Sequence, residues 1–309
     1  MNTKATAYFT PLSQLGILQI TGDDAADFLQ NMFTNDIKLL ANNQSQLSGF
    51  CNAKGRLFAI FLLIRRCNGF QIILPKSMCG LLQQRLSMFV LRANVIITDI
   101  SEELICLGLI QPLTNNIAGI ELPSEDYHGS EINGNLAIKL PGNCQRYLVL
   151  AQPNQISELS NTLQQQKWQQ TDPSTWQIVD IKAGLPTIFP ESKEMFTPQQ
   201  VNLDLIEGVS FDKGCYPGQE VVARLHYLGK ASRRMFLARC KLTSDLPITG
   251  SPVADQEGNT CGHIVRMQSD ANDTLILLLS LKLALAKQQL FINNSAISEY
   301  PSAFITNEK

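Results

Sequence analysis

The sequence predicts an α+β protein with a ferredoxin-like lobe and a small β-barrel near its C-terminal end. Strand and helix patterns over residues 57–110 follow the order β-β-α-β-β, which is typical of a ferredoxin-like lobe. After Arg234 the chain alternates short apolar runs with Gly, Pro and Asn turns, as small all-β barrels do. With 309 residues, 44% of them hydrophobic, the chain is long enough for two or three domains.

The N-terminal pattern predicts a strand over residues 16–20 and then a helix. Asp23 or Asp24 precedes the helix, and an aspartate there accepts hydrogen bonds from the first unpaired N–H groups. The apolar residues of this helix recur at the i, i+3, i+4, i+7 spacing of a single buried face: Ala25, Phe28, Leu29 and Met32.

The predicted lobe opens with a β-hairpin. Residues 57–64 form a continuous apolar run typical of a buried strand, and residues 70–74 form a second strand. Asn68-Gly69 between the two runs is a strong hairpin signal. The lobe continues with a helix over residues 76–90 and strands over residues 95–97 and 104–110.

The second half of the chain adds helices and then the barrel. Residues 153–168 predict one helix, and a further helix starts at Asp172-Pro173 and stops at Gly184. The strands expected here cover residues 136–140, 147–150, 235–242, 260–267, 274–281 and 289–292.

Composition bounds the function. A formal net charge of −2 is unlike a dedicated nucleic-acid-binding protein, so direct nucleic-acid binding is not expected. None of the eight cysteines has C-x-x-C spacing, and the three histidines form no ligand pair, so no metal site is expected. The first residues lack a secretory signal, and the longest apolar run, residues 275–281, is too short for a bilayer. We therefore expect reduced thiols, a cytoplasmic location and no membrane contact.

The most informative segment is FDKGCYPGQE, residues 211–220. Cys215 lies between Lys213 and the Pro217-Gly218 turn, just ahead of a predicted helix. Unpaired N–H groups and the positive end of the helix dipole favour a thiolate at that place, and Lys213 adds a nearby cation. The alternative is a buried, inert cysteine.

This segment also carries a family resemblance. Lys213-Gly214-Cys215-Tyr216-x-Gly218-Gln219-Glu220 resembles the hallmark motif of the YgfZ-type folate-binding proteins, relatives of the aminomethyltransferase (T-protein) of the glycine cleavage system. The resemblance runs from about residue 8 to residue 235. Further segments resemble the family in the expected order, namely residues 21–25, 28–30, 34–36, 52–56 and 181–186.

The resemblance implies an aminomethyltransferase-like folate-binding fold with two α/β lobes, one of them ferredoxin-like, plus the barrel. Residues 1–50 and 115–230 would form a discontinuous folate-binding-like lobe that carries the cysteine motif. Residues 51–114 would form the ferredoxin-like lobe, and residues 231–309 the barrel domain.

The function implied is that of a folate-binding accessory protein, a monomer, that supports assembly or repair of iron–sulfur enzymes and thereby tRNA modification. Its partners would be tetrahydrofolate or a derivative and iron–sulfur enzymes such as tRNA-modifying radical enzymes. Cys215 would be the working residue, as thiolate, transient sulfur or iron–sulfur cluster contact, or redox partner. Lys213 would tune it.

The folate-binding residues implied by the resemblance are Trp176, Tyr216, Gly218, Gln219, Glu220 and Arg224. An aromatic wall suits a flat pterin ring, and the family places a tryptophan near the folate. The alternative is that Trp176 is a core residue at helical spacing with Val179 and Ala183.

Basic residues follow the cysteine motif. One interpretation is a groove for an anion such as a polyglutamate tail or RNA phosphates; the other is a solvated face at a domain junction. The residues of this cluster are Arg224, His226, Lys230, Arg233 and Arg234.

Three positions depart from the family pattern. Residues 52–59 contain no acid, whereas the aminomethyltransferase has an aspartate there, so a standard aminomethyltransferase is not expected. Lys182 stands where an acidic residue can occur, and Leu15 where a tryptophan can. The alternatives kept open are a tetrahydrofolate-dependent one-carbon transferase and a binding module in which Cys215 is structural.

Overall fold

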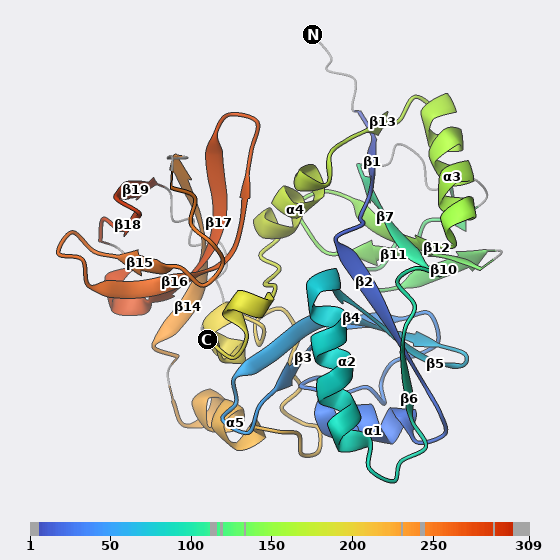
Figure 1. Ribbon diagram of the computed structural model, residues 1–309, viewed down its shortest axis with the longest axis horizontal. Coiled ribbons are helices and arrows are strands. Elements are labelled where there is room, and N and C mark those ends of the chain that lie inside the picture. Colours follow the sequence, from blue (N-terminus) through green and yellow to red (C-terminus); the bar gives the residue numbers. More distant parts are fainter. Residues whose placement is uncertain are drawn as a thin grey trace. The chain divides into compact units, whose positions relative to one another are not determined.

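The computed structural model describes residues 6–111, 116–117, 120–132, 134–229, 231–241, 245–286 and 288–298 (Figure 1). The chain packs as two compact units that alternate along the sequence. The first comprises Met1–Leu29, Ile37–Gln46 and Phe61–Trp176; the second comprises Gln30–Asp36, Leu47–Ile60 and Gln177–Lys309. Helices and strands occur in both, so the α+β class is confirmed.

One sheet of the first unit is a six-stranded sheet covered by a helix. Its strands are antiparallel neighbours except for one parallel pair, β1 with β13. Helix α3 (Pro153–Gln165) buries Ile156, Leu159 and Leu163 in the core of this sheet. In order, the strands are β10 (Gly129–Ile132), β11 (Asn135–Leu140), β12 (Arg146–Ala151), β7 (Ile105–Ile110), β1 (Tyr8–Pro11) and β13 (Gln169–Gln170). A separate short pair is β8 (Asn116–Ile117) with β9 (Ile120–Glu121).

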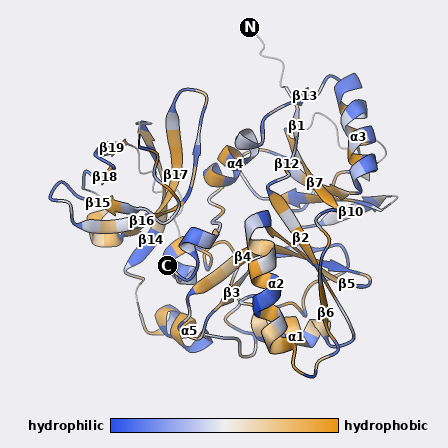
Figure 2. Cartoon of the chain, viewed as in Figure 1, coloured by the Kyte–Doolittle hydropathy of each residue, from blue (hydrophilic) through white to orange (hydrophobic). Residues whose placement is uncertain are grey.

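The first unit also holds an antiparallel set of strands packed against helix α2 (Lys76–Val90). In order, these strands are β4 (Leu57–Arg66), β5 (Gly69–Pro75), β2 (Leu15–Thr21) and β6 (Ile96–Asp99). The buried face of α2 carries Met78, Cys79, Leu82 and Leu86. Figure 2 shows hydrophobic colour along β4, whose first eight residues are buried. The chain passes from the second unit to the first within this strand.

One strand lies elsewhere than the sequence predicts. β7 was expected in the same lobe as the hairpin of β4 and β5, but it pairs with β1 and β12 in the six-stranded sheet. The strand next to β5 is instead β2, which lies between β5 and β6. Apolar periodicity identifies a strand but not its partner, because pairing depends on residues far away in the sequence.

The second unit contains the closed barrel, which confirms the predicted small C-terminal barrel. Its core is apolar and includes Val253, Ile264, Leu277 and Leu279. In order, its strands are β14 (Arg233–Lys241), β17 (Thr274–Lys282), β16 (Thr260–Ser269), β15 (Pro252–Ala254), β18 (Phe291–Ile292) and β19 (Ser295–Ser298). The 3-10 turn η3 (Leu283–Leu285) follows β17.

The rest of the second unit surrounds a further apolar core that includes Leu57, Val201, Leu203, Val222 and Met235. Its elements are most of β3 (Ser45–Cys51), the first part of β4, the 3-10 turns η1 (Pro190–Ser192) and η2 (Pro198–Val201), and helix α5 (Gln219–Tyr227). Helices α1 (Ala25–Met32) and α4 (Pro173–Lys182) each contribute residues to both units.

Most predicted helices agree with the structure within one or two residues. The helix expected over residues 153–168 ends earlier, at Gln165, because Lys167 takes a left-handed φ of 66° that stops it. Among the described residues, no helix combines the length and apolar character needed to cross a membrane.

Candidate functional site

The cysteine motif lies in the second unit, where two segments from the N-terminal part of the chain support it. Residues 30–36 contact Lys213, and the turn at residues 52–55 contacts Gly218. Three of the segments that carry the family resemblance therefore meet in one unit, although Lys213 follows Gln30 by 183 residues.

Lys213 anchors the motif on its N-terminal side. Its side chain is buried, and Nζ donates hydrogen bonds to the carbonyl oxygens of Gln30 (2.6 Å), Phe33 (2.5 Å) and Asn35 (3.1 Å). An ammonium group has three donors, so all of them are used in the interior. Burial lowers the pKa of Lys213 to about 8, against an opposing effect of the Asp36 carboxylate. Because no donor remains for the Cys215 sulfur, Lys213 can influence Cys215 only through its charge and not through a hydrogen bond.

The acceptors of Lys213 belong to a segment that is itself fixed. Thr34 Oγ1 donates to the carbonyl oxygen of Gly208 (2.7 Å) and accepts from the N–H of Gly49 (2.8 Å). Asn35 Nδ2 donates to the carbonyl oxygen of Glu207 (2.7 Å). Short polar side chains thus tie this segment to its neighbours and aim its carbonyl groups inward.

Tyr216 lies beneath the Lys213 ammonium. The distance from Nζ to the ring centroid is 5.3 Å, within the range of a cation–π contact. The ring is buried, and its hydroxyl has no hydrogen-bond partner among the described residues. Burial raises the pKa of Tyr216, and the nearby Cys51 adds to this effect, so the hydroxyl stays protonated.

Gly218 anchors the motif on its C-terminal side, at the N-cap of α5. It has φ 79°, a left-handed conformation that glycine adopts without cost. A Cβ here would lie 2.4 Å from the carbonyl oxygen of Asn52 and 2.5 Å from the N of Gly55. That turn is held by Asn52 Oδ1, which accepts from the N–H groups of Lys54 (2.9 Å) and Arg56 (3.1 Å). Only glycine permits this approach of two backbones.

Cys215 is exposed, between these two anchors. Gln219 Nε2 bridges the loop by donating to the carbonyl oxygen of Lys213 (3.4 Å). The other cysteines are exposed at 67, intermediate at 144 and buried at 51, 79, 106, 240 and 261. The thiol of the motif is therefore accessible, unlike that of a buried structural cysteine.

The basic cluster after the motif does not form one group. Arg234 is buried in an ion pair with Asp204 (2.7 Å), so for this residue both interpretations, an anion groove and a solvated face, are wrong. A buried guanidinium requires such a partner. Arg233 Nη1 donates to the carbonyl oxygen of Cys261 (3.1 Å), and the His226 ring stacks on Phe211 at 3.6 Å.

Two members of the proposed set on α5, Glu220 and Arg224, are exposed. Lys230 lies outside the described residues. Lys182, at the end of α4, is exposed as well. Within the described ranges, no three His, Cys, Asp or Glu side chains are grouped as metal ligands.

Trp176 belongs to the first unit, whereas the motif belongs to the second. Its side chain is only 2% exposed. The ring fills the space over Gly108, where a Cβ would lie 2.4 Å from Cε3, and the Arg146 guanidinium lies 5.5 Å from the ring centroid. These are the surroundings of a core residue.

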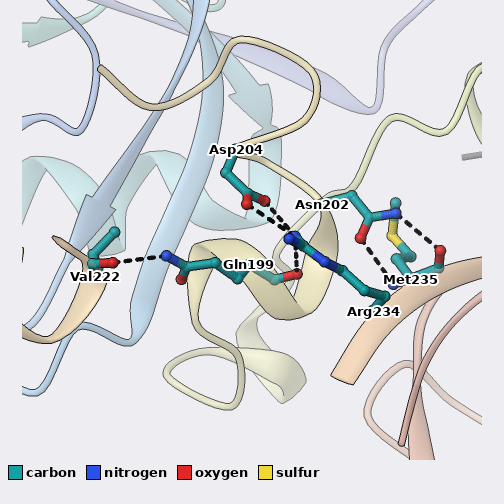
Figure 3. A network of polar contacts seen from close by, with 6 residues as sticks. All are labelled: Gln199, Asn202, Asp204, Val222, Arg234 and Met235. Atoms are coloured by element: carbon teal, nitrogen blue, oxygen red, sulfur yellow. Dashed lines mark hydrogen bonds and ion pairs between the residues drawn. The ribbon is translucent and has the colours of Figure 1, made fainter. Parts of the chain in front are cut away.

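A polar network beside the motif has no local signature in the sequence. Figure 3 shows Gln199, Asn202 and Asp204 reaching α5 on one side and β14 on the other. Thr197-Pro198 gave a signal for the turn itself, since it is an N-cap and N1 pair, but not for the partners.

No protein-family model matches the chain. Its fold matches the glycine cleavage system aminomethyltransferase T from Bartonella henselae with a TM-score of 0.76 at 17% identity, over 98% of this chain and 87% of that one. The protein is therefore one with the aminomethyltransferase-like fold, as predicted.

Sequence relatives define the family. The tRNA-modifying protein YgfZ of Colwellia psychrerythraea is 30% identical over 76% of this chain and 72% of its own length. That of Photobacterium profundum is 31% identical over 80% and 74%, and that of Edwardsiella ictaluri 31% over 72% and 68%. The chain belongs to the YgfZ family of tRNA-modifying proteins.

Proposed function

We propose that this protein acts in tRNA modification by supporting the assembly or repair of iron–sulfur enzymes that modify tRNA, with Cys215 as the working residue. The observation that carries the proposal is the exposed thiol of Cys215, held between the anchored positions Lys213 and Gly218. The names of the relatives support the tRNA part. We place this work in the cytoplasm.

The chemistry proposed for Cys215 is transient. A thiolate attacks sulfur and binds iron, whereas a resident cluster is usually held by four cysteines. The motif supplies one exposed thiol, and Cys51, the cysteine that acts electrostatically on Tyr216, is buried. Contact with a sulfur atom or a cluster of a client enzyme therefore suits Cys215 better than storage of a cluster.

We also propose tetrahydrofolate, a carrier of one-carbon groups, as a ligand. Glu220 and Arg224 are exposed one turn apart on α5. A carboxylate accepts from pterin N–H groups, and a guanidinium pairs with the carboxylates of a glutamate tail. The Tyr216 hydroxyl is a further polar atom that lacks a partner among the described residues. These donors and acceptors fit the polar parts of a folate, while the Trp176 ring is already packed on Gly108.

Complementation tests the main proposal. In a host lacking the gene, wild type, Cys215→Ser or Cys67→Ser is returned at equal expression, and a cluster-dependent methylthiolated tRNA nucleoside is measured by mass spectrometry. Cys67 is the matched control, because it is exposed but lies outside the motif. We expect wild type and Cys67→Ser to restore the nucleoside and Cys215→Ser to fail. Full restoration by Cys215→Ser would overturn the role of the thiol.

Alkylation tests the thiol directly. Burial raises the pKa of Cys51 and Cys106 to about 12 and that of Cys79 to about 11, so these thiols are protonated as well as inaccessible at neutral pH. We expect iodoacetamide to label Cys215 before them, and also before the exposed Cys67. Labelling of Cys215 at the rate of the buried thiols contradicts the proposal.

Calorimetric titration with tetrahydrofolate tests the ligand. Saturable heat is expected with wild type and with Arg85→Met, a change on α2 far in sequence from the motif. Glu220→Gln and Arg224→Met should each weaken binding, by about tenfold for a charge-assisted hydrogen bond. No heat with wild type rules the folate proposal out.

The second candidate is a tetrahydrofolate-dependent one-carbon transferase, favoured by the aminomethyltransferase-like fold. Against it, the segment of residues 52–59 has no acid, and Asn52 Oδ1 is used to hold its turn. A glycine-cleavage assay with lipoyl carrier protein and tetrahydrofolate separates the two. Turnover would favour the transferase, and its absence the accessory role.

A further inference from the structure

We infer that Gln199 is a positioning residue for Cys215, and that it fixes the first turn of α5 relative to strand β14 of the barrel (Figure 3). The inference rests on the proposed function in one respect: it takes Cys215 as the working residue. It concerns only the second unit, to which all of these residues belong.

Gln199 lies in η2 and is only 2% exposed. Its Nε2 donates to the carbonyl oxygen of Val222 at 2.8 Å, and Val222 is fully buried. Its Oε1 has no partner among the described residues. A flipped amide would set Oε1 against the Val222 oxygen, two acceptors without a proton, so the single hydrogen bond defines the orientation of the side chain.

From Val222 the contact continues to the cysteine loop. The N–H of Val222 donates to the carbonyl oxygen of Gly218 (3.3 Å), the residue whose backbone rests on the turn at residues 52–55. Gly218 follows Cys215 by three residues, with Tyr216 and Pro217 between them. Two hydrogen bonds therefore lead from Gln199 to the C-terminal anchor of the loop.

On its other side, the η2 segment is fastened to β14 twice. Arg234 Nη1 donates to the Gln199 carbonyl oxygen (3.1 Å) and to both carboxylate oxygens of Asp204 (2.7 and 2.9 Å). Asn202 Nδ2 donates to the Met235 carbonyl oxygen (2.9 Å), and Asn202 Oδ1 accepts from the Met235 N–H (3.0 Å). The contacts of Arg234 are buried and charge-assisted, and such contacts fix geometry closely. Gln199 is thus bound to β14 through its backbone carbonyl and to α5 through its side-chain amide.

The barrel offers a matched control. Arg266 on β16 also forms a buried ion pair, with Asp180 at 2.8 Å, and Nη1 donates to the carbonyl oxygen of Leu185 (3.3 Å). These partners lie on α4 and in the segment after it. Loss of the Arg266 ion pair removes a buried interaction at least as strong as the Gln199 hydrogen bond, but without touching η2 or α5.

Hydrogen exchange of the full chain, followed by mass spectrometry, tests the inference with Gln199→Met and Arg266→Met. Loss of one buried neutral hydrogen bond corresponds to about fivefold faster opening. We expect about fivefold faster exchange in the peptide that covers residues 216–226 in Gln199→Met, with other peptides unchanged. Arg266→Met should speed exchange at residues 180–185 instead. Unchanged exchange at residues 216–226 in Gln199→Met, or equal acceleration in all peptides, overturns the inference.

Complementation with the same variants completes the test. Gln199→Met should restore less of the modified nucleoside than wild type, and Arg266→Met, at matched expression, as much as wild type. If Cys215→Ser fails but Gln199→Met restores the nucleoside fully, the positioning role is wrong and the proposed function survives. If Cys215→Ser restores it, the proposed function fails, while exchange still reports whether Gln199 holds α5.

Discussion

The cysteine loop and the surroundings of Trp176 are built from the same three parts: an aromatic ring, a cation near its face and a glycine. In the loop these are Tyr216, Lys213 and Gly218; in the first unit they are Trp176, Arg146 and Gly108. Around Trp176 the glycine makes room for the ring, and all three parts are closed in. In the loop the glycine instead lets two backbones meet, and the residue between the anchors remains exposed. Similar local chemistry thus serves a core in one place and presents a side chain in the other.

The largest expected effect tests whether Trp176 is a core residue. Trp176→Ala should lower the free energy of unfolding by about 3–5 kcal/mol, because it empties a closed space. Urea unfolding measures the loss, and Cys215 alkylation in the folded variant should equal that of wild type. A stable variant with impaired folate binding would instead make Trp176 a ligand residue.

Gly218→Ala should cost at least about 2 kcal/mol. The left-handed φ of 79° alone costs an L-residue about 1–2 kcal/mol, and the new Cβ meets backbone atoms that cannot turn away. Gly80→Ala in α2 is the matched control, since apart from its chain neighbours and the backbone of its own helix nothing lies within 4 Å of its Cβ position. The control should gain about 0.5–1 kcal/mol from helix propensity. Equal stability changes in thermal unfolding of the two variants would contradict the close approach at Gly218.

Lys213 should make stability depend on pH. Burial lowers its pKa to about 8 from the ordinary 10.5. Between these values the unfolded chain holds a proton that the folded chain has released, so the free energy of unfolding rises with pH in this window. Below about pH 8, burial of the charged amine opposes folding by its full amount, although the hydrogen bonds of Nζ still hold the motif. The free energy of unfolding of wild type, relative to that of Lys213→Met, should therefore rise by on the order of 1 kcal/mol per pH unit in that window.

Urea titrations across this window, with Lys54→Met at an exposed position as control, measure the difference in slope. If wild type and Lys213→Met change in parallel, the pKa of the buried amine is not lowered.

The smallest effect is expected at the residue with the largest proposed role. Cys215→Ser changes an exposed side chain, so stability should stay within about 0.5 kcal/mol of wild type. Cys51→Ser, at a buried position, should cost about 1–3 kcal/mol by placing a hydroxyl in the core. A large loss in Cys215→Ser would indicate a structural cysteine.

The sequence predicts the features that neighbouring residues determine better than those that depend on residues far apart in the chain. Helix α2 and the hairpin of β4 and β5 follow from local periodicity and the Asn-Gly turn, and both are confirmed. β7 was located as a strand, but its neighbours β1 and β12 come from other parts of the chain. No local pattern encodes that choice.

The candidate site divides in the same way. The motif itself drew attention to Lys213 and Cys215, because their spacing and turn chemistry are local. The acceptors of Lys213 are backbone oxygens of residues 30–35, which have no side-chain signature. Gln199 is an ordinary polar residue until the fold sets it against Val222.

The alternation of the chain between the two units affects how the protein can be made. On the ribosome, residues 30–36 and 47–60 emerge early, yet the rest of their unit, from Gln177 onward, is synthesised last. Until then the carbonyl groups that accept hydrogen bonds from Lys213 in the folded protein belong to an incompletely folded chain, which is exposed to chaperones and proteases. Neither unit is continuous in the sequence: a fragment from Gln177 to Lys309 would contain Cys215, Lys213 and Gly218 but would lack residues 30–36 and 52–55, which these two anchors contact.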